Sequence, residues 1–137
     1  MVAVASAIGQ TASDDSGKAV VYVYRLQGGS GPPPNKPSVY CDEHELARMQ
    51  NGRYFSTRLD AGKHSCHSTD GQSVVELDVK AGQTYYIRGE VVPIKGKPRG
   101  AITRMSPEQG ASEVRNLKPL PSGMVKDPGR VLLDPPK

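Results

Sequence analysis

Two turns of the same pattern constrain the fold of this chain more than any other feature: Leu59–Lys63 (LDAGK) and Val79–Gln83 (VKAGQ). Each turn ends one run of alternating apolar and polar residues and opens another. A glycine just beyond the last apolar side chain supplies the positive φ that lets a strand fold back on its neighbour. The pattern therefore predicts a meander of antiparallel strands, with Gly62 and Gly82 at positive φ. Gly52 marks a further tight turn through the Asn51-Gly52 dipeptide that hairpins favour.

The strand signals extend on both sides of these turns. Residues 19–26 are β-branched or aromatic nearly throughout, which predicts a central strand buried on both faces. The proline-rich segment Gln27–Pro37 predicts an exposed loop. Further strands are expected at Ser38–Cys41, Glu45–Met49, Arg53–Leu59, His64–Ser68, Val75–Val79, Gln83–Val92 and Ala101–Met105.

One helix is expected after the last strand. Ser106, Pro107 and Gln109 have the spacing of an N-cap, a first-turn proline and the third residue of a capping box. The helix should run to about Arg115 and rest apolar side chains on the sheet, namely Ala111, Val114 and Leu117.

Composition agrees with a single β domain. The chain has 137 residues, of which 36% are hydrophobic, with 15 glycines and 12 prolines, and this suits a small fold rich in turns. We predict an all-β protein: an antiparallel β-sandwich of about seven or eight strands with one short C-terminal helix, over residues 18–120. Residues 1–17 are expected to be an N-terminal tail or a signal-peptide remnant, and residues 121–137 an extended or disordered tail.

The distribution of charge along the chain and the residues near its N-terminus indicate which partners and which cellular location to expect. The net charge of +4 is spread along the chain, which argues against a nucleic-acid partner. No stretch is long and apolar enough for a transmembrane segment. Ala5-Ser6-Ala7 resembles a signal-peptidase site, so residues 1–7 are either the end of a secretion signal or an ordinary tail of small residues. An exported protein, periplasmic or extracellular, is the expected location.

All cysteines and histidines fall in two short segments, 41–44 (CDEH) and 64–67 (HSCH). An even cysteine count in an exported domain favours a disulfide between Cys41 and Cys66. Two alternatives stay open. The thiols can be free and buried, or Cys41, His44 and Cys66 with His64 or His67 can form a four-ligand zinc site.

Enzymatic motifs are not evident. No G-x-S-x-G, H-E-x-x-H, phosphate loop or dinucleotide fingerprint is present, and no cofactor is expected. Ser65 lies beside histidines, but adjacent strand residues point to opposite faces. Two other sets of residues are candidates for chemistry or binding. The first is the carboxylates, which we expect to be solvated or to cap backbone N–H groups: Asp42, Glu43, Glu45 and Asp60. The second is the tyrosines, which could form a binding platform but are expected to be half-buried sheet residues: Tyr22, Tyr24, Tyr40, Tyr54, Tyr85 and Tyr86.

Segments 38–55, 59–64, 79–88 and 107–111 together resemble the bacterial domain-of-unknown-function 2846 family. The resemblance spans roughly residues 18–120 and implies a transthyretin-like or carboxypeptidase-regulatory-like β-sandwich, usually exported or lipid-anchored, with no established reaction. A lipobox cysteine, which lipoprotein members carry near their start, is not found here.

The expected function is that of a non-enzymatic structural or protein-interaction module of the cell envelope or extracellular space. The alternative is a metal- or small-ligand-binding domain built on the Cys41/His44 and His64/Cys66/His67 segments. Self-association is expected to use an edge strand, with Ser38–Cys41 as the edge and Val131–Leu133 as the strand added by a neighbouring copy.

Overall fold

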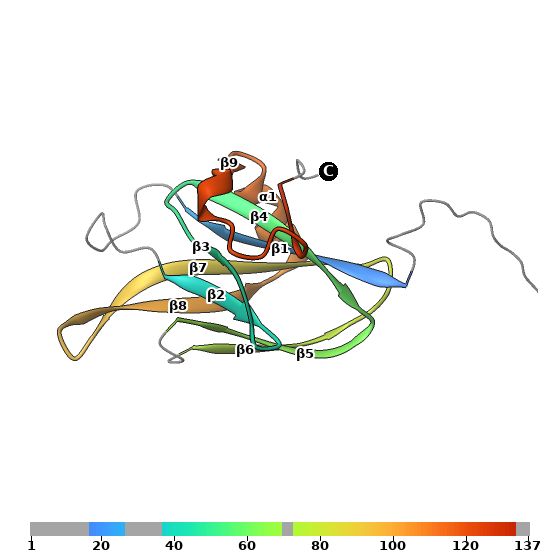
Figure 1. Cartoon of the computed structure of the whole chain (residues 1–137), viewed down its shortest axis with the longest axis horizontal. Helices are drawn as coiled ribbons and strands as arrows, with labels where there is room; N and C mark the ends of the chain where they lie inside the picture. Colours follow the sequence, from blue (N-terminus) through green and yellow to red (C-terminus); the bar gives the residue numbers. More distant parts are fainter. Residues whose placement is uncertain (1–16, 27–36, 70–72, 134–137) are drawn as a thin grey trace, which may run out of the picture.

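The computed structural model describes residues 17–26, 37–69 and 73–133, which form two packed β-sheets and one short helix (Figure 1). The predicted N-terminal tail and the proline-rich loop lie outside the described residues, apart from Gly17 and Pro37. The fold is therefore an all-β sandwich with one helix, as predicted, although the described part has ten strands rather than seven or eight.

The larger sheet has six strands in the order β10-β4-β1-β7-β8, with β9 also paired to β4. The smaller sheet has four, in the order β3-β2-β5-β6. One central pair, β1 with β7, is parallel, which the antiparallel prediction did not include. The bounds are β1 Lys18–Arg25, β2 Ser38–Cys41, β3 His44–Arg48, β4 Arg53–Asp60, β5 Gly62–Ser68, β6 Val74–Val79, β7 Thr84–Ile94, β8 Lys97–Met105, β9 Lys118–Pro119 and β10 Val131–Leu132.

The two matched turns carry the chain from one sheet to the other. The first joins β4 of the larger sheet to β5 of the smaller, and the second joins β6 back to β7. Gly62 and Gly82 have φ of 130° and 81°, so the predicted positive φ is confirmed, and Gly52 also has a positive φ of 72°. The predicted meander is wrong, because a turn signal marks where a strand ends but not which strand it pairs with.

The main core lies between the sheets. Val21 and Val23 of β1 pack there with Phe55 of β4 and Ile87 of β7, against the inner face of the smaller sheet. The other face of β1 is covered too, because Tyr22 and Tyr24 lie in a second buried cluster. The prediction of a central strand buried on both faces is confirmed.

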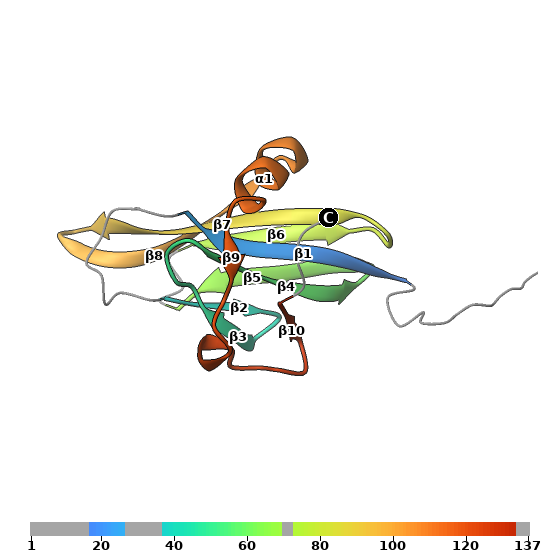
Figure 2. The same ribbon diagram turned by 90° about the horizontal axis from the view of Figure 1, so that it is seen from above.

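Helix α1 (Pro107–Val114) covers that outer face of the larger sheet (Figure 2). The side chain of Ser106 accepts a hydrogen bond of 3.2 Å from the backbone N–H of Gln109, as a cap should. The side-chain amide of Gln109 donates a hydrogen bond of 3.2 Å to the carboxylate of Glu113, one turn further along the helix. Gly110 lies directly on the ring of Tyr86, and this close approach explains a glycine inside a helix.

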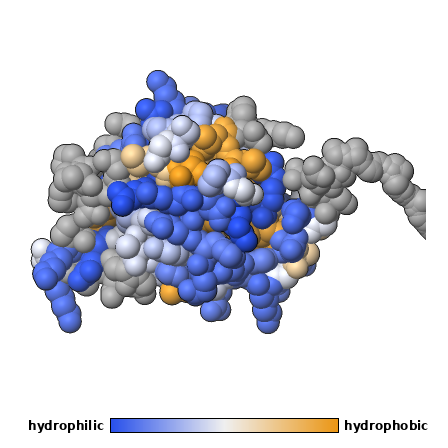
Figure 3. Space-filling view, in the orientation of Figure 1, coloured by the Kyte–Doolittle hydropathy of each residue, from blue (hydrophilic) through white to orange (hydrophobic). Residues whose placement is uncertain are grey.

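Residues 118–133, here called the C-terminal strap, are laid against the sandwich. The strap begins with β9. From residue 121, where an extended or disordered tail was expected, its described part has a 3-10 turn at Ser122–Met124 and the strand β10. The strap also reaches the smaller sheet, because the backbone N–H groups of Lys126 and Asp127 both donate to the carbonyl of Leu46 in β3. In Figure 3, an apolar patch lies near the C-terminal end of the described chain, and most of the remaining visible face is hydrophilic.

The predicted edge strand is wrong. Ser38–Cys41 forms β2, which lies between β3 and β5 and has a neighbour on both sides. The prolines that suggested an edge precede the strand, so they remove no hydrogen bond from its ladder. Val131 and Leu132, expected to pair with another copy, pair with β4 of their own chain.

None of the helices in the described part of the chain has the length and apolarity needed to cross a membrane.

Candidate functional site: a polar cleft beside a disulfide

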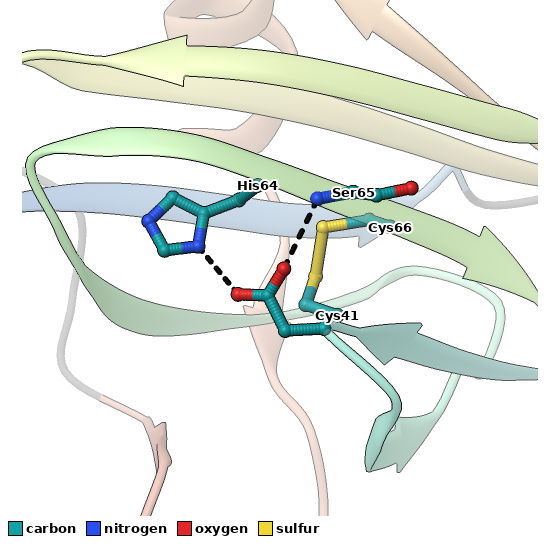
Figure 4. Close-up of a disulfide and its surroundings, with 5 residues drawn as sticks. Cys41, His64, Ser65 and Cys66 are labelled. Carbon is teal, nitrogen blue, oxygen red and sulfur yellow. Dashed lines mark hydrogen bonds and ion pairs between the residues drawn. A yellow bond between two sulfur atoms is a disulfide. The ribbon is translucent and has the colours of Figure 1, made fainter.

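Cys41 and Cys66 form a disulfide between β2 and β5 (Figure 4). The two residues are directly opposite in the strand pair, with their Cα atoms 4.0 Å apart, and both are buried in the main core. The predicted bridge is confirmed, and the free-thiol alternative is wrong. A loop of this length, 25 residues of sequence separation, stabilises a fold by about 3 kcal/mol when it is closed, in the chain-entropy model.

The turn that follows Cys41 has an unusual backbone. Cys41 pairs with His44, so Asp42 and Glu43 make a two-residue hairpin loop. Their φ values are 51° and 70°, which define a type I′ turn, a geometry that favours Asn-Gly. Asp tolerates the left-handed conformation, but Glu does not favour it, so this turn must be held by its surroundings.

The carboxylate of Asp42 provides that hold. One of its oxygens accepts a hydrogen bond of 3.2 Å from the backbone N–H of Ser65, and the other bonds the ring Nδ1 of His64. Dashed lines in Figure 4 mark these two bonds, to the ring of His64 and to the backbone of Ser65, beside the Cys41–Cys66 disulfide. The backbone N–H of Asp42 also donates to the carbonyl of Ser65 at 2.8 Å. The turn is thus tied to β5 by the disulfide and by three hydrogen bonds.

The surroundings of His64 favour its protonated form. Its Nδ1 faces the Asp42 carboxylate and its Nε2 lies 2.6 Å from the carbonyl oxygen of Asp60. Both neighbours only accept hydrogen bonds, so both ring nitrogens must carry a hydrogen. Partial burial alone lowers the pKa of His64, but the bonds to Asp42 and Asp60 outweigh it and raise the pKa above its usual value.

Asp42 responds in the opposite direction. Its partial burial favours the neutral acid, but the hydrogen bonds from His64 and Ser65 and the positive charge of His64 favour the carboxylate more strongly. The pKa of Asp42 is therefore lowered. Each residue stabilises the charged form of the other.

These residues line a cleft of about 450 Å³ at the end of the sandwich where β4 passes into β5. Its charged groups largely pair with one another. Lys18 lies 2.6 Å from Asp60, and this pairing lowers the pKa of Asp60. Arg130 of the C-terminal strap contacts the ring Nε2 of His44 at 3.2 Å and also pairs with the carboxylate of a neighbouring strap residue, Asp127, at 3.1 Å. The cleft therefore joins β1, the β2–β3 turn, β5 and the strap.

The structure gathers some predicted residues here and disperses others. Asp42, His44, Asp60 and His64 line the cleft. His67 lies elsewhere, stacked on Tyr40 with ring centroids 4.9 Å apart. Ser65 contributes its backbone, and the carboxylate of Glu45 accepts a hydrogen bond from the hydroxyl of Ser38.

The zinc alternative is wrong, because the disulfide uses both sulfurs that the metal would need. Within residues 17–26, 37–69 and 73–133, no group of three or more His, Cys, Asp or Glu side chains is placed to hold a metal ion.

A tyrosine platform does not form either. Four of the six tyrosines lie in the buried cluster under α1: Tyr22, Tyr24, Tyr54 and Tyr86. The hydroxyl of Tyr24 donates a hydrogen bond of 2.6 Å to Glu113, which Arg88 also contacts at 3.0 Å. Burial, together with the Glu113 carboxylate, raises the pKa of Tyr24, so this hydroxyl stays neutral.

Sequence reasoning missed the basic residues of the cleft. Lys18 would follow from the β1–β4 register, which places it opposite Asp60, but that register was not predicted. Arg130 has no sequence signal, since it is 86 positions from His44 and reaches it only because the strap folds back.

Fold and site define a small β-sandwich fastened by a cross-strand disulfide. The chain belongs to the DUF2846 family, described as a protein of unknown function, whose model matches residues 15–97, more than half of the sequence. No curated protein and no solved structure matches the chain.

Proposed function

We propose that the chain is an exported, non-enzymatic module that acts as a structural or protein-interaction domain in the cell envelope or extracellular space. The Cys41–Cys66 disulfide carries this proposal. Cytosolic thiols are kept reduced, whereas a structural disulfide persists in oxidising compartments. A sandwich of this size has a small core and gains substantially from one bridge.

The cleft beside the disulfide supports a structural role better than a catalytic one. In its protonated form His64 donates from both ring nitrogens, to Asp42 and to the Asp60 carbonyl, so this form has no lone pair with which to act as a general base. The described residues that line the cleft include no serine, threonine or cysteine. Its ion pairs hold two turns and the C-terminal strap in place.

The open sides of the sandwich are closed by hydrogen bonds, which favours a rigid module. On one side, the hydroxyl of Ser73 bonds both the N–H and the carbonyl of Ile102 in β8, at 2.9 and 2.8 Å. The hydroxyl of Ser68 donates to the carbonyl of Gly100 on the same strand. On the other side, the C-terminal strap covers β3. The likeness to transthyretin-like or carboxypeptidase-regulatory-like domains stays a prediction.

Cell fractionation tests the proposal. The natural full-length protein is followed with an antibody in cytoplasmic and extracytoplasmic fractions, and intact cells are cross-linked in parallel. We expect the protein outside the cytoplasm and in cross-linked species heavier than the 14.7 kDa chain. Recovery from the cytoplasm contradicts export, and recovery only as the free chain contradicts a structural or interaction role.

A further inference from the structure

A second cleft, of about 490 Å³, lies at the other end of the β1–β4 strand pair. One wall is the turn between β3 and β4, residues 50–53, and the other is the link from α1 to β9, residues 116–118. The backbone N–H of Lys118 donates to the carbonyl of Gly52 at 3.2 Å, so the two walls are joined. The cleft is therefore built from fixed elements.

The charges of this cleft are unlike those of the first. Its lining contains Arg53 and Lys118 and no carboxylate. Across the described part of the chain, neither residue forms an ion pair, and the contact of the Arg53 guanidinium is to the carbonyl of Pro119 at 3.3 Å. Two positive charges thus lie on this lining without a carboxylate partner among the described residues.

One polar atom beside these cations lacks a partner within the described residues. The side-chain oxygen of Asn51 is buried and has no hydrogen-bond partner within the described residues. Unpaired buried polar atoms are rare in native folds, and this oxygen, which only accepts, calls for a donor such as a water or a ligand hydroxyl. Gln50 and Asn116 add two more amide side chains to the lining.

We propose that this second cleft binds the anionic group of a small molecule, a phosphate or a carboxylate. Guanidinium and ammonium groups form strong charge-assisted hydrogen bonds with both anions. Amide side chains suit the hydroxyl groups of the same molecule, because they both donate and accept. The volume is in the range of about 300–1,000 Å³ that small-molecule sites occupy, and is larger than a bare ion needs.

An NMR titration of the full chain tests this site at constant ionic strength. The probes are glucose 6-phosphate, gluconate and glucose, which offer a phosphate, a carboxylate and no charge. Amide signals are followed at residues 50–53 and 116–118. We expect saturable shifts with one or both charged sugars and none with glucose. The charged sugar that binds more tightly shows whether the site prefers a phosphate or a carboxylate.

Matched variants separate a site from general charge attraction. Arg53→Gln and Lys118→Gln each remove one cation from the lining, and each should weaken binding about tenfold or more, the loss of one charge-assisted hydrogen bond. Lys80→Gln removes the same charge from the exposed β6–β7 turn and should bind as the natural chain does. No saturable shift with either charged sugar, equal binding of glucose, or an equal loss in Lys80→Gln each overturns the proposal.

Discussion

Asp42 and His64 form an ion pair across the β2–β5 strand pair, immediately beside the disulfide that joins the same strands. The pair is partly shielded from solvent, with 14% of the His64 side chain and 39% of the Asp42 side chain exposed. It links the strained β2–β3 turn to the sheet. Its protonation state therefore affects the stability of this end of the sandwich.

Stability should fall as pH rises above neutrality, in part because of His64. Its folded pKa is raised, so its contribution is complete below the unfolded value of about 6.5 and is lost as pH rises through the folded value. The contribution of Asp42, whose folded pKa is lowered, is present above about pH 4 and is lost as pH falls through the folded value. The pair is thus fully effective between about pH 4 and 6.5.

This effect is measured by urea unfolding of the natural chain and of His64→Gln from pH 5 to 9. Near pH 5, the loss of the charged hydrogen bond should lower the free energy of unfolding by about 1–3 kcal/mol. The two unfolding curves should converge as pH rises. A difference between them that is constant with pH would show that His64 does not titrate against Asp42.

Replacing Glu43 with glycine should stabilise the protein. Glu43 is exposed and has a φ of 70°, which glycine adopts without steric cost. We expect Glu43→Gly to raise the free energy of unfolding by about 1 kcal/mol. The control is Ala81→Gly, in a turn position without positive φ, which should not stabilise. A loss of stability in Glu43→Gly would mean that the turn is not strained.

Replacing Gly110 with alanine should destabilise the protein although alanine is the better helix former. A Cβ atom at this position would lie 2.3 Å from the Cγ atom of Tyr86. The helix or the ring must move, at a cost of about 1–3 kcal/mol, against a gain of about 1 kcal/mol in helix propensity. Gly123→Ala is the control, because nothing lies within 4 Å of its added methyl group. Equal thermal midpoints for the two variants would contradict this packing of α1.

Gly62→Val and Gly82→Val should each lower the free energy of unfolding by about 1–3 kcal/mol. No atom lies within 4 Å of an added Cβ at either position, so the cost comes from the backbone conformation alone. Denaturant midpoints measure it. Midpoints unchanged in both variants would mean that these crossings between sheets tolerate a β-branched residue.

The sequence predicted individual elements better than their arrangement. The strand expected at Val75–Val79 is confirmed as β6, in which Val75, Leu77 and Val79 are buried and the residues between them exposed, because burial on one side imposes a period of two. The Ser106 cap and the paired cysteines were also predicted from local signals. The topology was not predicted, because Gly62 and Gly82 show where strands end but not which strands pair with each other.

The candidate site was predicted only in part, for the same physical reason. Asp42, His44 and His64 lie near the cysteines in sequence and were singled out. Lys18 and Arg130 reach the cleft through the β1–β4 register and the return of the strap. Such long-range contacts depend on the whole fold, and no local pattern encodes them.

Thiol trapping on the protein taken directly from its producing cells tests the central claim, a disulfide-fastened module that works outside the cytoplasm. Cells are lysed in acid, free thiols are alkylated without reductant, and the intact mass of the chain is measured. The account predicts no alkylation at Cys41 or Cys66 and a mass two hydrogens below that of the reduced chain. Two alkylated cysteines in the freshly trapped protein would contradict it.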